Sequence, residues 1–201
     1  LDTILDGILH PVWTWKFITS APLRFSNVIG KSKADGNDAA TLGGYLLNQF
    51  DSSVSWRDLD WFQANWKGPI VIKGIQSIED ARLAVTAGVE GIAVSNHGGR
   101  QLDGAPPAIE LIEPIAQAVG RDVDIICDGG VRRGSDIVKA LALGARACMV
   151  GRPYLYGLAV GGEKGVDHTL NLLRDGVSRT LGLTGCTKVS EITRDLIAFR
   201  R

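Results

Sequence analysis

From residue 69 onward, short apolar runs alternate with longer amphipathic stretches. This pattern predicts strands over 69–73, 92–95, 123–127 and 146–150, and helices over 77–87, 107–119, 135–143, 154–160 and 165–181. Ser77 is expected to cap the first of these helices, and Gly144 to end the third. Four consecutive strand–helix units with nearly continuous apolar strands indicate a parallel sheet covered by helices.

Polar side chains and glycines gather where these strands end. In chain order they are Lys73, His97, Arg100, Asp128, Gly129, Gly130, Arg132, Gly151 and Arg152. A (β/α)8 TIM barrel builds its active site at the carboxyl ends of its strands, so we predict an α/β fold of this kind. A doubly wound open sheet would also bind its ligand at strand ends. Its glycine fingerprint belongs after the first strand, however, and none is present there.

The first 68 residues carry a different pattern. Residues 1–9 and 10–18 predict short helices, residues 30–44 a surface loop, and residues 55–62 a capped helix. No second set of four strands is visible, and four strands alone would leave two long unpaired edges. We therefore expect a longer chain, rather than a partner, to complete the barrel.

These patterns together give a domain prediction. Residues 1–201 are expected to form the C-terminal portion of a single barrel domain that supplies about the last four βα units. Within it, residues 1–68 would be a helical and loop segment over the mouth of the site. Residues 69–201 would supply βα units 5–8 and the terminal helices.

The composition is that of a soluble globular protein, with 45% apolar and 22% charged residues and a formal net charge of zero. Nothing in this balance favours a nucleic-acid partner, and no apolar run is long enough to cross a membrane. The cysteines form no CxxC pair, and the histidines show no metal-ligand spacing, so no metal site is expected. Cys127 and Cys148 are interpreted as small buried hydrophobic residues in a reducing compartment.

A glycine-rich loop after the second predicted strand carries His97 and Arg100. Histidine exchanges protons near neutral pH, and arginine is shaped to hold a carboxylate. The pair indicates an enzyme acting on a small carboxylic acid, with His97 as base, although a structural histidine is the alternative. Asp103 is interpreted as a cap rather than as an orienting carboxylate. Lys73 is expected to contact a cofactor or substrate rather than lie on the surface.

A phosphate site is predicted after the third and fourth strands. Gly129 and Gly130 stand between a strand and a helix, where backbone N–H groups and the helix N-terminus attract an anion. Arg132 follows them, and Gly151 with Arg152 repeats the arrangement after the next strand. Two such loops on adjacent strands favour phosphate binding over tight turns with solvated arginines.

Three segments resemble the FMN-dependent α-hydroxy acid dehydrogenase/oxidase family, which includes L-lactate dehydrogenases and glycolate oxidase. They are Pro69-Ile-Val-Ile-Lys-Gly-Ile75, Ser95-Asn-His-Gly-Gly-Arg-Gln-Leu-Asp103 and the segment Asp128-Gly-Gly-Val-Arg-Arg-Gly-Ser-Asp-Ile-Val-Lys-Ala-Leu-Ala-Leu-Gly-Ala-Arg146. The resemblance runs from about residue 56 to about residue 183 and corresponds to the second half of the family's eight-stranded barrel. The family's aspartate that orients the base has no counterpart in this sequence, so part of the site is expected to lie elsewhere.

The resemblance implies a role for each site residue. His97 is implied as the base and Arg100 as the partner of the substrate carboxylate. Lys73 is implied beside the N1/O2 edge of the flavin, and Asp128 at the ribityl chain. The implied FMN phosphate site takes Gly129, Gly130, Arg132, Gly151 and Arg152.

The implied reaction is FMN-dependent oxidation of a small L-2-hydroxy acid, with L-lactate favoured, to the 2-oxo acid. The electron acceptor is left open among a quinone, a cytochrome and oxygen. Alternatives are an oxygen-using oxidase of the glycolate or lactate type, another phosphate-binding barrel, and a non-catalytic half-barrel. A homo-oligomer in the cytoplasm is expected. Peripheral contact with the inner face of the membrane stays an alternative, because the family's variable segment falls at about residues 20–50.

Overall fold

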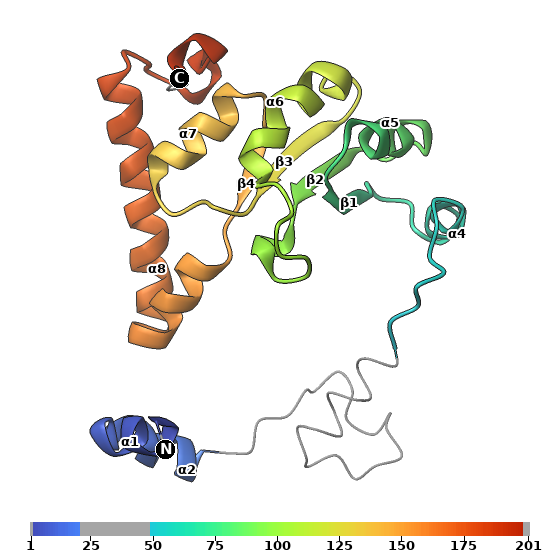
Figure 1. The fold of residues 1–201 in the computed structure, drawn as a ribbon. Coiled ribbons are helices and arrows are strands. Elements are labelled where there is room, and N and C mark those ends of the chain that lie inside the picture. The colour runs from blue at the N-terminus through green and yellow to red at the C-terminus, as the bar shows by residue number, and fades with distance from the viewer. Residues whose placement is uncertain (1, 21–48, 199–201) are drawn as a thin grey trace. The chain divides into compact units, whose positions relative to one another are not determined.

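The computed structural model describes residues 2–20 and 49–198, which belong to two compact units, Leu1–Val54 and Ser55–Arg201 (Figure 1). The first unit contains helices α1 (Asp2–Leu9) and α2 (Pro11–Thr19), which confirm the two helices predicted there. The Thr14 hydroxyl donates to the Gly7 carbonyl at 2.6 Å and joins the two helices. The predicted loop at 30–44 lies outside the described residues.

The second unit is built on a parallel sheet whose strand order follows chain order (Figure 1). Its strands are β1 (Val71–Ile75), β2 (Gly91–Ser95), β3 (Asp124–Asp128) and β4 (Ala147–Met149). One helix follows each strand, which is the repeating βα arrangement of a barrel. All four predicted strands are confirmed, with ends that move by one or two residues.

The helices of this unit alternate with its strands. They are α4 (Asp58–Asn65), α5 (Ile78–Thr86), α6 (Ala108–Val119), α7 (Gly134–Ala142) and α8 (Arg152–Leu183), with short 3-10 turns η2 (His97–Gly99), η3 (Val189–Glu191) and η4 (Arg194–Leu196). In the described ranges, no helix is both long and apolar enough to pass through a bilayer.

Three predicted helix signals are confirmed. The Ser77 hydroxyl accepts the Asp80 N–H at 3.0 Å and caps α5. Gly144 follows α7 with φ of 108°, the left-handed conformation that ends many helices. Gly161 and Gly162 break the helical geometry inside α8 and separate the two helices predicted there.

Two predicted boundaries are wrong. Lys73 is not the last residue of its strand, because β1 continues through Gly74, whose φ is 101°, to Ile75 with a shift in register. Helix α4 begins three residues after Ser55, because the Asp58 carboxylate accepts the backbone N–H and hydroxyl of Ser55 in a turn.

The hydrophobic core lies between the sheet and its helices. Ile92, Val94 and Ile125 from the strands meet Ile112 and Ile115 from α6, and each is at most 2% exposed. Burying a side chain of this size stabilises a protein by about 1.5–3 kcal/mol. Strand β2 and the apolar positions of β3 therefore lie in the packed core, whereas β1 and β4 are largely exposed in the described residues.

The backbones of helices α7 and α8 are in direct contact where Gly134 faces Gly176. A Cβ atom on Gly176 would come 2.9 Å from the Gly134 nitrogen, and a Cβ on Gly134 would overlap the backbone of Gly176 and Val177. Only glycine fits this contact. It fixes the first residue of α7, which directly follows the predicted phosphate loop.

Gly134→Ala should therefore lower the free energy of unfolding by about 1–3 kcal/mol, because the added methyl group forces the two helices apart. Gly182→Ala in α8 is the matched control, since its Cβ would meet no atom within 4 Å and alanine favours helix by up to about 1 kcal/mol. Urea unfolding of both variants measures the difference. Equal stability of the two variants would contradict the close helix contact.

Candidate functional site

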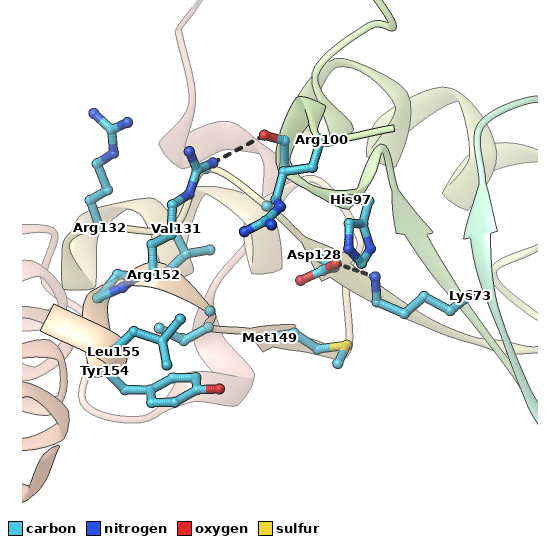
Figure 2. Close-up of a pocket in the computed structure, with 16 residues that line it drawn as sticks. Lys73, His97, Arg100, Asp128, Val131, Arg132, Met149, Arg152, Tyr154 and Leu155 are labelled. Atoms are coloured by element: carbon cyan, nitrogen blue, oxygen red, sulfur yellow. Dashed lines mark hydrogen bonds and ion pairs between the residues drawn. The ribbon is translucent and has the colours of Figure 1, made fainter. Parts of the chain in front are cut away.

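All nine predicted site residues line one cavity of about 310 Å³ at the carboxyl edge of the sheet (Figure 2). They are Lys73, His97, Arg100, Asp128, Gly129, Gly130, Arg132, Gly151 and Arg152. Parallel strands end at a common edge, so residues far apart in sequence meet there. The volume lies at the lower end of the range typical of small-molecule sites, about 300–1,000 Å³.

A polar network joins three strands beside this cavity. The Lys73 ammonium on β1 lies 2.6 Å from Asp128 Oδ2 on β3. Between them, the Ser95 hydroxyl on β2 accepts from Lys73 Nζ at 3.0 Å and donates to Asp128 Oδ2 at 2.6 Å. Ser95 is 1% exposed and Asp128 is partly buried, whereas the Lys73 side chain is 39% exposed, so only the Ser95 end of the network is shielded from water.

The network keeps Asp128 ionised. Partial burial by itself would raise the pKa of the carboxyl group. The hydrogen bonds from Lys73 and Ser95, together with the charges of Lys73 and His97, outweigh burial and hold the pKa of Asp128 below its usual range. A fixed negative charge therefore stands beside Lys73 in the cavity.

His97 adopts a backbone conformation that is uncommon for its residue type. Its φ is 57°, the one positive value among non-glycine residues in the described part of the chain. The His97 N–H donates to Ser95 Oγ at 3.0 Å, and Asn96 Oδ1 accepts the N–H groups of Gly98 and Gly99 at 3.0 and 3.2 Å. Such enforced conformations cluster at functional sites.

The predicted phosphate loops offer two arginine side chains and an open glycine turn, although Asp136 already accepts the backbone N–H groups of Arg132 and Arg133 at 3.1 and 3.0 Å. Gly129 and Gly130 have φ of 111° and 76°, and no atom lies within 4 Å of the Cβ position of Gly130. Arg132 and Arg152 form no ion pair with any described residue, and Arg152 donates to the Gly98 carbonyl at 3.2 Å. Two unpaired arginines beside an open glycine loop fit a phosphate group.

The sequence analysis missed several residues of the site. The sequence pattern predicts Ser95 only as the last residue of a strand, not as the link of the network. The feature that could indicate its role is a hydroxyl group at the end of an otherwise apolar run. Met149 and Tyr154 also line the cavity. The Asp103 side chain bonds to no described residue and begins no helix, so neither interpretation of it is supported.

Similarity to known proteins decides the family. The model of the family described as FMN-dependent dehydrogenase matches residues 1–199. The chain belongs to the FMN-dependent dehydrogenase family. An L-lactate dehydrogenase of Pseudomonas putida (strain GB-1) is 43% identical over 196 residues, which are 97% of this chain and 51% of that protein. An L-lactate dehydrogenase of Alcaligenes faecalis is 42% identical and is covered over 51% of its length.

Solved structures of the same family share the fold. A mandelate oxidase crystallised with benzoyl-formic acid superposes with a TM-score of 0.68 and 48% identity, over 70% of this chain and 42% of the oxidase. The fold is therefore part of a (β/α)8 barrel, as predicted. The chain spans about half the length of the curated relatives that it matches.

FMN is the cofactor of this family, and the residues present suit it. The open glycine loop with Arg132 and Arg152 would hold its phosphate, and Lys73 with Asp128 would lie along the rest of the molecule. Within the described ranges, no cluster of three or more His, Cys, Asp or Glu residues has the arrangement of a metal site.

The Lys73–Asp128 pair gives a pH-dependent stability. The pKa of Asp128 is lower in the folded chain than the unfolded value of about 3.9, so its stabilising contribution is present above that pH and is lost as pH falls through the folded pKa. Lys73→Met removes a hydrogen bond and a positive charge, so the pKa of Asp128 should rise. The loss of unfolding free energy should be largest near neutral pH and disappear in acid.

Urea unfolding across this pH range measures the effect. Lys164→Met is the matched control, because Lys164 is exposed on α8 and forms no ion pair with any described residue. If the unfolding free energies of Lys73→Met and the parent chain differ by the same amount at every pH, Lys73 does not lower the pKa of Asp128.

Proposed function

We propose that the protein carrying this chain oxidises a small L-2-hydroxy acid, with L-lactate as the favoured substrate, to the corresponding 2-oxo acid. The observation that carries the proposal is the convergence of His97 and Arg100 with the Lys73–Asp128 pair in one cavity. FMN, when bound, supplies the acceptor for the two electrons of the reaction. The chain's own residues bind the acid and move its proton.

Each residue is assigned a step in this scheme. Arg100 binds the substrate carboxylate through its planar guanidinium and so fixes the orientation of the acid. His97, three residues before it, takes a proton from the hydroxy acid. The Lys73 ammonium faces the cofactor and stabilises negative charge there, while Asp128 and Ser95 hold the ammonium in place.

The phosphate loops orient the cofactor. Arg132 and Arg152, with the backbone N–H groups around Gly129, Gly130 and Gly151, hold the phosphate at one end of the cavity. Arg152 also contacts the carbonyl of Gly98, which follows His97. The phosphate site and the catalytic loop are therefore joined by one side chain.

The comparisons support the substrate class and are compatible with two classes of electron acceptor. The curated relatives named above are L-lactate dehydrogenases, which favours L-lactate and an acceptor such as a quinone or cytochrome. The similar solved structures are mandelate oxidases, which favours oxygen as the acceptor. Self-association, contact with a membrane surface and a cytoplasmic location stay predictions.

An anaerobic reduction experiment tests the function. FMN-loaded protein is mixed with L-lactate in the absence of oxygen, and loss of the oxidised-flavin absorbance is followed. Readmission of oxygen with formation of peroxide would identify an oxidase, whereas reoxidation by a quinone or cytochrome c alone would identify a dehydrogenase. Bound FMN that stays oxidised with L-lactate, glycolate and L-mandelate would contradict the proposed function.

His97→Gln should slow flavin reduction by about 10²- to 10⁴-fold, the usual contribution of a general base. FMN affinity, measured by flavin fluorescence, should stay unchanged because His97 is not among the phosphate-binding groups. His168→Gln on the exposed side of α8 is the control. Rapid reduction in His97→Gln would exclude His97 as the base.

Arg100→Lys should lower kcat/KM for L-lactate by about 10- to 100-fold, because a lysine lacks the paired donors of a charge-assisted bidentate contact. Arg174→Lys, an exposed arginine of α8, is the control. Steady-state kinetics with the acceptor identified above measure the ratio. An unchanged kcat/KM would remove Arg100 from carboxylate binding.

A further inference from the structure

Cys127 and Cys148 lie opposite one another on neighbouring strands. The parallel register of β3 and β4 pairs their Cα atoms, so both side chains leave the same face of the sheet. Cys127 is buried in the hydrophobic core, and Cys148 packs against that core half-buried. The remaining cysteine, Cys186, lies beyond α8, and its thiol bonds to the Glu191 carbonyl at 3.8 Å.

The two neighbouring thiols differ in the direction of their pKa shifts. Interaction with Cys148 lowers the pKa of the Cys127 thiol, against the opposing effects of burial and of Asp128. Interaction with Cys127, together with burial and the negative charge of Asp136, raises the pKa of Cys148. Ionisation of the pair therefore favours the Cys127 thiol over the Cys148 thiol.

A second cavity, of about 400 Å³, includes Cys127 in its lining. Lys139 and Arg152 line the same cavity. Asp136 lines it as well, and its carboxylate is engaged by two backbone N–H groups at 3.1 and 3.0 Å. A molecule as small as hydrogen peroxide has a route to a cysteine that otherwise belongs to the core.

We propose that Cys127 and Cys148 are a site of oxidative modification, at which a peroxide converts the two thiols into an intramolecular disulfide. The Cys127 thiolate attacks one peroxide oxygen, the O–O bond breaks, and a sulfenic acid forms while hydroxide leaves; the hydroxide takes up the proton released by the Cys127 thiol and becomes the first water. The Cys148 sulfur then attacks the Cys127 sulfur, the S–S bond forms, and the S–O bond breaks. The departing hydroxide takes the Cys148 proton and leaves as the second water.

The electrons balance in this sequence, because the two thiols lose two electrons and two hydrogen atoms and the peroxide is reduced to two waters. The backbone is close to the required spacing. Parallel neighbours lie about 4.8 Å apart, within the Cα separation of about 4.4–6.8 Å that disulfides span.

The cysteines lie next to the candidate site, and the cavity that includes Cys127 shares Gly129, Gly130 and Arg152 with the proposed phosphate site. Asp128 and Met149, the residues that follow the two cysteines in sequence, face the opposite side of the sheet and line the first cavity. The disulfide would join β3 to β4 just behind the phosphate loops. The proposal does not depend on the reaction proposed for that cavity.

The test uses the full chain with Cys186→Ser, which removes the one cysteine outside the pair. The folded protein is treated with hydrogen peroxide, and the remaining thiols are alkylated after unfolding and counted by mass spectrometry. The expected result is the loss of both thiols, a peptide linking Cys127 to Cys148, and recovery of both thiols with dithiothreitol. Adding Cys148→Ser should abolish the linked peptide and leave Cys127 as a sulfenic or sulfinic acid.

Three results would overturn the proposal. The thiols could survive peroxide in the folded chain and react only after unfolding. Cys127 could be oxidised to a sulfinic acid with Cys148 still present and no linked peptide formed. The link could also appear between two chains rather than within one, which electrophoresis without reductant distinguishes by mass. Circular dichroism of each variant ensures that a folded chain is compared.

Discussion

The Ser95 hydroxyl joins three strands at one point, and the candidate site depends on that junction. It accepts from Lys73 on β1 and from the His97 N–H, and it donates to Asp128 on β3. A hydroxyl has one proton and two lone pairs, so all its capacity is used. The same oxygen therefore fixes the positions of the Lys73 and Asp128 side chains relative to one another. It also supports the uncommon backbone conformation of His97, the residue proposed as the base. The site is held by the sheet rather than by its loops.

Sequence patterns predicted the parts of this structure that are local. The alternation of apolar and polar residues located four strands and the helices between them, and Ser77 and Gly144 marked helix ends through their own backbone chemistry. The predicted break between the helices over 154–160 and 165–181 coincides with the kink that the structure has at Gly161 and Gly162. The gathering of site residues at one edge was also predictable, because parallel strands align their carboxyl ends.

What the sequence did not predict depends on contacts between distant segments. The register shift at Gly74 places Lys73 inside β1 rather than at its end. Such a shift exists only in the pairing of β1 with β2. The role of Ser95 requires the register of three strands, and the pairing of Cys127 with Cys148 requires the register of β3 with β4. In the described residues, β1 and β4 each pair on one side only, so closing a barrel requires strands from outside this part of the chain.

The backbone contact between α7 and α8 has a consequence for ligand binding. The loop that carries Gly129, Gly130 and Arg132 is fixed at both ends, by the ion pair of Asp128 and by the contact of Gly134 with Gly176. A short loop held in this way has already lost most of its conformational entropy when the chain folds. An anion that binds there does not have to order it again, so more of the interaction energy appears as affinity. The contact between Gly134 and Gly176 would therefore contribute both to the free energy of unfolding and to the affinity of the proposed phosphate site.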